Sequence, residues 1–172
     1  MELKFDEIAN LPKRPIEQLS LHSASEYACA KMLEKYAGWR GMEGVTVQIP
    51  VGRAIFDFRI GDVFIEYHPI SLRRECLTDA VNRVNSAIHP LPKINKLEVL
   101  DAISEELKKQ YTKRRGQVLA AHPSYGSMEL ICVHDMQSFV EQVIYRFATK
   151  PCPSLSECTK EFRKLQRRYK KI

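Results

Sequence analysis

The sequence lacks the features that would place the chain in a membrane or outside the cell. No apolar run approaches the length of about 18 residues that a membrane-spanning helix needs. The first residues, Met-Glu-Leu-Lys-Phe-Asp-Glu, do not show the charged-then-apolar pattern of a secretory signal peptide. We therefore expect an intracellular protein, located in the cytoplasm or with the nucleoid or nucleus.

Cysteines at metal-ligand spacing are missing as well. The chain has five cysteines, an odd number, and none of them forms a Cys-x-x-Cys pair. This pattern signals neither a zinc site nor a disulfide framework. We expect reduced thiols, several of them small core residues. The sequence also contains no internal repeat and no low-complexity tract.

What the sequence does have is a surplus of positive charge. The net charge of +6 favours a polyanionic partner, with nucleic acid ahead of an acidic membrane surface. A hydrophobic fraction of 44% is sufficient for a single core. The length of 172 residues indicates one α/β domain over residues 1–150, with a basic helix over 151–172 appended to it.

The stretch from residue 53 to residue 68 has the alternation of a β-hairpin. Two runs of β-branched and aromatic residues flank Gly61-Asp62, and a two-residue loop that begins with glycine suits a type II′ turn. Because side chains alternate between the faces of a strand, one face is expected to be apolar. That face carries Phe56, Phe58, Ile60, Val63, Ile65 and Tyr67, and the register pairs Ile60 with Val63, Phe58 with Ile65 and Asp57 with Glu66.

The other face of the hairpin carries two opposed carboxylates, Asp57 and Glu66. Directly opposed residues have Cβ atoms about 4.5–5.5 Å apart, and like charges at that distance are destabilising. A divalent cation would offset the repulsion, and oxygen ligands suit Mg²⁺. A solvated polar face, with Arg59 helping to neutralise the acids, explains the pattern equally well. The remaining residues of this face are Ile55, Phe64 and His68.

Helical patterns surround the hairpin. The apolar residues between positions 23 and 36 recur at helical spacing, which predicts a helix with Glu26 in its first turn. Ser23-Ala-Ser-Glu26 is also a capping box, and a capping role for Glu26 is compatible with a chemical one. A strand that follows a crossover helix can run parallel to its neighbour. Further helices are expected over 71–91, 96–121, 136–147 and 151–172, and further strands over 45–50 and 128–133.

Three of these helices carry clusters of cations that suit either phosphate contacts or a solvated face. The C-terminal one is basic and amphipathic, which suits DNA, an acidic partner or a dimer interface. The other histidines, at positions 22, 89, 122 and 134, fall at element edges, where solvent-facing or turn-capping roles are the default. The cations are Arg73 and Arg74 in the first helix, Lys113, Arg114 and Arg115 beside Tyr111 in the second, and Arg163, Arg167 and Arg168 in the third.

The order of these elements resembles the PD-(D/E)xK nuclease superfamily, which has the restriction-endonuclease-like fold. In that family helices flank a mixed sheet, an acid ends the second strand, (Asp/Glu)-x-Lys follows on the third, and a Glu often lies on the first helix. The resemblance covers roughly residues 22–147 and matches Asp57 to the first acid, Glu66 to the second and Glu26 to the helix acid. Two departures stand out: Phe56 replaces the Pro before the first acid, and His68 replaces the motif Lys.

The resemblance implies a DNA endonuclease that uses Mg²⁺, with Mn²⁺ as a substitute, and that is selective for branched or junction DNA. Asp57 and Glu66 would hold the metal, Glu26 would bind it directly or through water, and His68 would serve as the base or position the water. A homodimer is compatible with this, because cutting both strands of a duplex calls for two sites. The alternatives are a non-cleaving nucleic-acid-binding module and a protein-interaction subunit, for which truncation after Lys150 should leave the fold intact.

Overall fold

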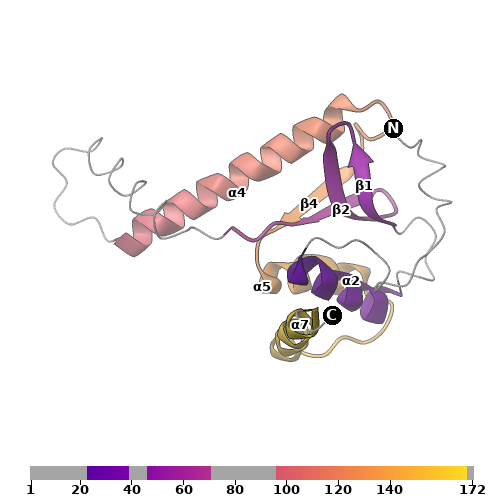
Figure 1. The fold of residues 1–172 in the computed structure, drawn as a ribbon, viewed down its shortest axis with the longest axis vertical. Helices are drawn as coiled ribbons and strands as arrows, with labels where there is room; N and C mark the ends of the chain where they lie inside the picture. Colours follow the sequence, from indigo (N-terminus) through magenta and orange to yellow (C-terminus); the bar gives the residue numbers. More distant parts are fainter. Residues whose placement is uncertain (1–22, 39–45, 71–95, 170–172) are drawn as a thin grey trace. The chain divides into compact units, whose positions relative to one another are not determined.

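The computed structural model describes residues 23–38, 46–70 and 96–169. They fall into two compact units (Figure 1). The first unit contains the described residues up to His68 and those from Gly116 onward, and the second unit is Pro69–Arg115. The helix expected over 71–91, with Arg73 and Arg74, lies outside the described residues.

The first unit is built on a four-stranded mixed sheet in the order β1-β2-β3-β4 (Figure 1). The first three strands form the expected antiparallel meander, and β4 runs parallel to β3. This confirms an α/β chain with an open mixed sheet and flanking helices. The strands are β1 (Thr46–Val51), β2 (Ala54–Ile60), β3 (Val63–Tyr67) and β4 (Glu129–Val133).

The hairpin between β2 and β3 has the register that the Gly61-Asp62 loop predicted. Phe58 pairs with Ile65 and Ile60 with Val63. Gly61 has a φ of 55°, whereas Gln48 is the one non-glycine residue with a positive φ in the described ranges. Asp62 therefore has a negative φ, which fits the expected type II′ turn and excludes type I′.

Helices α2 and α7 of the first unit begin with side-chain caps from serine. Helix α2 (Ala24–Ala37) starts after Ser23, whose Oγ accepts from Glu26 N at 3.1 Å. Helix α7 (Leu155–Tyr169) starts with a complete capping box, in which Ser154 and Glu157 bond each other's backbone N–H. The helix expected over 136–147 is continuous but contains a π-helical turn. Its segments are α5 (Met136–Phe139), η2 (Val140–Ile144) and α6 (Tyr145–Phe147).

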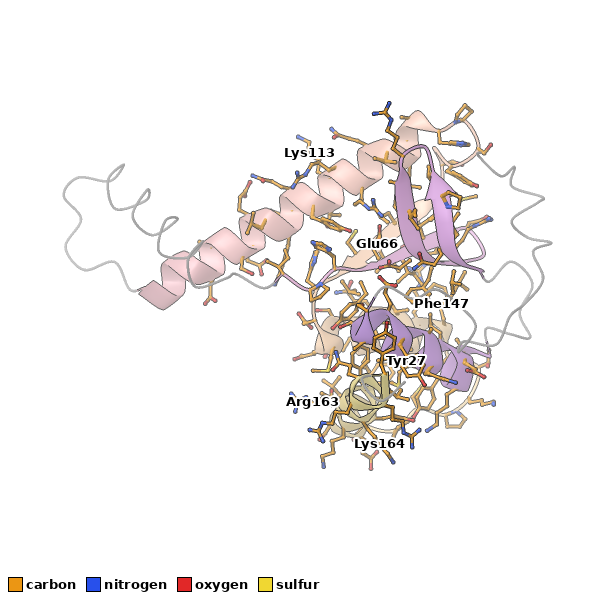
Figure 2. All side chains as sticks on the ribbon, in the orientation of Figure 1. Tyr27, Glu66, Lys113, Phe147, Arg163 and Lys164 are labelled. Carbon is orange, nitrogen blue, oxygen red and sulfur yellow. The ribbon has the colours of Figure 1, made fainter. Side chains whose placement is uncertain are left out.

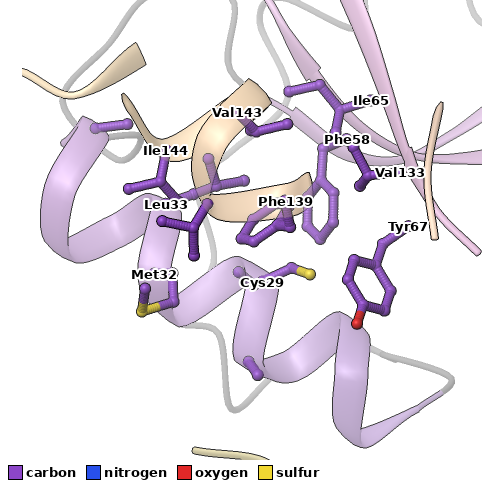
Figure 3. Close-up of a cluster of buried hydrophobic side chains, with 14 of the residues drawn as sticks. Cys29, Met32, Leu33, Phe58, Ile65, Tyr67, Val133, Phe139, Val143 and Ile144 are labelled. Atoms are coloured by element: carbon purple, nitrogen blue, oxygen red, sulfur yellow. The ribbon is translucent and has the colours of Figure 1, made fainter. Parts of the chain in front are cut away.

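The main core packs α2, η2 and α7 together with one face of the sheet (Figure 3). Helix α7 is part of this core, because Phe162 is fully buried and its ring stacks on Tyr67 with centroids 5.6 Å apart. Cys158 and Leu165 on the same side of α7 are buried as well. This packing argues against the expectation that truncation after Lys150 leaves the fold intact.

A second, smaller core covers the sheet face that was expected to be polar. Phe64 packs there with Leu119 and Tyr125, and Arg59 and Glu66 are each only 2% exposed. The alternative of a solvated polar face is therefore wrong for Arg59 and Glu66, because the end of α4 and the turn after it cover this side of the sheet. Phe56 was expected beside Phe58 but belongs to this second core, with its ring centroid 5.3 Å from that of Phe64.

Helix α4 (Lys96–Ala121) has the predicted bounds and contributes residues to both units. In the second unit Lys113 and Arg114 are exposed, and the Arg115 guanidinium lies over the ring of Tyr111 at 5.8 Å. Lys108 forms an ion pair with Glu105 one turn earlier, at 2.9 Å. None of the helices in the described ranges is long and apolar enough to cross a membrane.

Candidate functional site: a carboxylate cluster beside the β2–β3 hairpin

Asp57 lies at the point where the β2–β3 ladder ends. The paired residues run from Ile60 to Phe58 on β2, and Asp57 is the next residue. Its Oδ2 accepts a hydrogen bond from the backbone N–H of Tyr67 at 2.8 Å. The side chain thus takes a backbone donor at the end of the ladder. The expected direct pairing of Asp57 with Glu66 is replaced by a bond to the residue that follows Glu66.

Glu66 is buried on β3, with 2% of its surface exposed. It pairs in the parallel register with Cys132 of β4, and it shares its sheet face with Phe64. A buried charge is costly unless hydrogen bonds, an opposite charge or a metal ion satisfy it. Figure 2 labels Glu66, which lies on β3, one of the two strands of the hairpin. Its carboxylate is therefore held by the protein interior and not by bulk water.

Glu26 is tied to the sheet by Gln48, a residue that the sequence did not single out. Gln48 Nε2 donates to Glu26 Oε2 at 3.0 Å. In the register of β1 with β2, Gln48 stands between the pairs Val47–Phe58 and Ile49–Phe56, and so opposite Asp57. Its φ of 54° is left-handed, a strained conformation for a residue with a Cβ. Strained backbone often occurs at functional sites, and here it occurs at the residue that bonds the candidate acid Glu26.

The buried thiol of Cys29 reports the negative charge of the cluster. Burial raises the pKa of Cys29, and the charges of Asp57 and Glu26 raise it further. Both carboxylates are thus close enough to act on the same sulfur atom of α2. Cys29 remains a neutral thiol and packs with Met32 and Leu33 in the main core (Figure 3).

His68 follows the end of β3 and lies beside His134. The backbone N–H of His68 donates to Val133 O at 2.9 Å. The centroids of the His68 and His134 imidazole rings are 6.4 Å apart, and the rings lie edge to face. His134 Nδ1 lies 2.6 Å from His68 O. Because a carbonyl only accepts, Nδ1 is the donor and Nε2 of a neutral His134 is left as the acceptor. Partial burial lowers the pKa of His68, and His134 lowers it further, so both favour the neutral imidazole.

Arg59 does not occupy a solvated face. Its Nε donates to Gly61 O at 2.8 Å, and its guanidinium lies over the Phe64 ring at 5.8 Å. Burial lowers its pKa, while the nearby Tyr125 and Asp62 act in the opposite direction. These contacts anchor Arg59 at the turn end of the hairpin, where it closes the second core.

The candidate acids do not form a ready-made metal cluster. Within the described ranges, no group of three or more His, Cys, Asp or Glu side chains is arranged to hold a metal ion. The candidate cations divide between the units: Lys113, Arg114 and Arg115 belong to the second, and Arg163, Arg167 and Arg168 are exposed on α7 in the first (Figure 2). In the first unit Glu26 is bonded to Gln48, and Asp57 is bonded to the backbone of Tyr67, the residue that follows Glu66.

No family model matches the chain, and comparisons with curated proteins and with solved structures found no match.

Proposed function

We propose that the chain is a metal-dependent endonuclease that hydrolyses phosphodiester bonds in DNA, with a restriction-endonuclease-like fold. The proposal rests above all on Asp57, which leaves the ladder and bonds the backbone of Tyr67, directly beside Glu66. The element order and the mixed sheet support it, since they are what the resemblance to the PD-(D/E)xK superfamily implies. A preference for branched or junction DNA is part of the same proposal.

The carboxylates suit Mg²⁺, with Mn²⁺ as a substitute. Mg²⁺ prefers oxygen ligands, keeps several waters and is often held by one or two carboxylates. A site on Asp57 and Glu66, with Glu26 ligating directly or through water, therefore needs no third close protein ligand. When bound, the ion polarises the phosphate and lowers the pKa of a bound water.

The other residues of the site accept a proton or hold neighbouring groups in position. The neutral imidazole of His68 can accept the proton of the attacking water, which is the task of a general base near neutral pH. His134 holds that segment through its contact with the His68 carbonyl. Gln48 fixes the direction of the Glu26 carboxylate through its side-chain amide.

A cleavage assay on linear duplex, single strand, flap and four-way junction tests the proposal. Each substrate is incubated with Mg²⁺, with Mn²⁺ and with chelator, and wild type is compared with Glu66→Gln. The matched control is Glu141→Gln, which removes the same charge at an exposed position of η2. We expect metal-dependent cutting in wild type and control, and a loss of about 100-fold or more in Glu66→Gln. Equal activity of the two variants would refute the proposal.

One observation favours a second candidate, a nucleic-acid-binding module that does not cleave. His68 stands where the family that the chain resembles has Lys, and burial and the nearby His134 lower its pKa, which disfavours a positive charge there. A binding module should tolerate Asp57→Ala with little loss of DNA affinity. Binding that survives this change, together with no cutting on any of the four substrates, would favour the module over the nuclease.

A further inference from the structure

Helix α7 presents a stripe of cations on the side opposite its buried residues. At roughly 100° per residue, the five cations span an arc of about 140° centred opposite Cys158, Phe162 and Leu165. Each of the five is exposed, and Figure 2 shows Arg163 and Lys164 pointing away from α2. The stripe, called here the α7 cationic face, consists of Lys160, Arg163, Lys164, Arg167 and Arg168.

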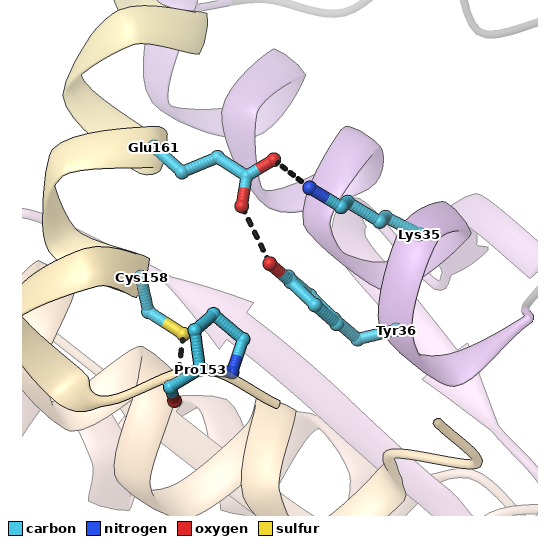
Figure 4. A network of polar contacts seen from close by, with 5 residues as sticks. All are labelled: Lys35, Tyr36, Pro153, Cys158 and Glu161. Carbon is cyan, nitrogen blue, oxygen red and sulfur yellow. Dashed lines mark hydrogen bonds and ion pairs between the residues drawn. The ribbon is translucent and has the colours of Figure 1, made fainter. Parts of the chain in front are cut away.

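The packing of α7 fixes the orientation of this face. The apolar side of α7 is used up in the main core, so it is not available for a partner. On one border Glu161 accepts from Lys35 Nζ and from Tyr36 Oη, each at 2.6 Å (Figure 4). On the other border Gln166 Nε2 donates to Ser25 Oγ at 3.1 Å. These bonds tie α7 to α2 on both sides and leave the cations outward.

The C-terminal end of the α7 cationic face lies beside the candidate site. Gln166 bonds Ser25, the residue before Glu26, and the rings of Tyr169 and Tyr27 lie 5.6 Å apart. Glu26 in turn is bonded to Gln48, opposite Asp57. A polyanion that follows the cations toward Arg168 therefore arrives at the N-terminus of α2, where Glu26 lies in the first turn.

We propose that the α7 cationic face binds the phosphate backbone of nucleic acid and leads the strand to the carboxylate cluster. This rests on the proposed function, since it identifies α7 as the surface that holds the substrate. The face consists of Lys and Arg side chains that suit contacts to phosphates, and such contacts carry no information about base sequence, so we expect binding through it to be independent of sequence. Its cations lie at spacings of three and four residues, and they form one continuous row along the helix.

The length of the face sets the expected size of the effect. From Lys160 to Arg168 the helix rises about 12 Å, which spans roughly three or four phosphates of one strand. Each neutralised phosphate contributes about 0.9 to the slope of log affinity against log salt for duplex DNA, and about 0.7 for single strands. Removal of four cations should therefore reduce the magnitude of the slope by about 3.

The test compares two variants with the same change in net charge. The α7 variant carries Lys160→Gln, Lys164→Gln, Arg167→Gln and Arg168→Gln. The control variant carries Arg53→Gln, Lys109→Gln, Arg146→Gln and Lys150→Gln, four exposed cations that are not among the candidate nucleic-acid-binding residues. Binding of a fluorescein-labelled 20-mer, single-stranded and duplex, is followed by anisotropy from 50 to 300 mM KCl in chelator. Circular dichroism and urea midpoints establish that both variants are folded.

We expect the slope of the α7 variant to fall by about 3 and that of the control by less than about 1. Equal losses in the two variants would mean that only net charge matters and would overturn the proposal. Polyglutamate is tested in the same way as a model of an acidic polypeptide. If the α7 variant loses binding to polyglutamate but keeps its binding to DNA, the proposal is overturned in favour of an acidic protein partner.

The outcome is separable from that of the nuclease proposal, because binding in chelator requires no cleavage. An α7-dependent slope without cutting leaves the surface established and refutes the nuclease. If wild type cuts DNA but the salt slope of the α7 variant is unchanged, the nuclease proposal stands and the α7 proposal is refuted. If both proposals hold, the α7 variant should raise KM with little change in kcat, as expected when uniform binding energy is lost.

Discussion

Replacing Phe162 by Ala tests whether α7 is part of the core. The Phe162 ring is fully buried and contacts two other aromatic rings, Tyr67 at 5.6 Å and Phe139 at 5.8 Å. Truncating a buried Phe to Ala costs about 3–5 kcal/mol through lost transfer free energy and the cavity that remains. The loss of two ring pairs, each about 0.5–1.5 kcal/mol, places the expected value in the upper half of that range.

Urea unfolding followed by circular dichroism measures this change. The neighbouring Arg163→Ala is the control, because an exposed substitution should change the free energy of unfolding by no more than about 0.5 kcal/mol. The m-value of Phe162→Ala should stay close to that of wild type if only stability changes. In a chain of 172 residues, a loss of this size lowers Tm by about 8–20 °C. A cost for Phe162→Ala as small as that of the control would refute the packing of α7 on the sheet.

Three further predictions concern the site and its surroundings. Gln48→Gly should be more stable than Gln48→Ala by about 1 kcal/mol, because glycine adopts the left-handed φ of 54° without a Cβ clash; equal urea midpoints would contradict the strain. Burial alone would raise the pKa of Glu161, but hydrogen bonds from Lys35 and Tyr36 outweigh it and the pKa lies below its ordinary value. Its stabilising contribution is thus present above the unfolded-state pKa and is lost as pH falls through the folded-state pKa, so Glu161→Gln should be destabilising at pH 7 and progressively less so as the solution is acidified; a difference independent of pH would argue against this. At a Mg²⁺ concentration tenfold above Kd, bound ion should add about 1.4 kcal/mol to the free energy of unfolding of wild type, and calorimetry should find no such gain for Asp57→Asn.

The parts of the fold that depend on short-range patterns were predicted from the sequence. The register of Phe58 with Ile65 follows from the Gly61-Asp62 turn, and the bounds of α4 follow from its helical periodicity. The position of Phe56 was not predictable from alternation. The regular pairing of β2 with β3 ends at Asp57, whose side chain accepts a hydrogen bond from the backbone of Tyr67, so Phe56 does not follow the alternation of Phe58. This bond joins positions that no local sequence pattern connects.

The candidate site divides in the same way. Glu26, Asp57 and Glu66 were singled out because their residue types and order resemble a motif, and their role stays a prediction. Gln48 and His134 were missed, because a left-handed backbone at Gln48 and a contact from His134 to the His68 carbonyl have no signature in the sequence. The burial of Glu66 was missed too, since it depends on side chains from a distant turn that cover the face of its strand.

Helix α2 couples the stability of the core to the geometry of the site. One side of it packs in the main core, and its first turn carries Glu26. Because α7 holds α2 through Gln166 and Glu161, loosening α7 should shift Glu26 relative to the sheet. Core variants in α7 are therefore expected to lower stability and cleavage together, whereas Glu66→Gln should lower cleavage far more than stability. A variant that destabilises α7 but leaves cleavage at full rate would mean that Glu26 is held by Gln48 alone.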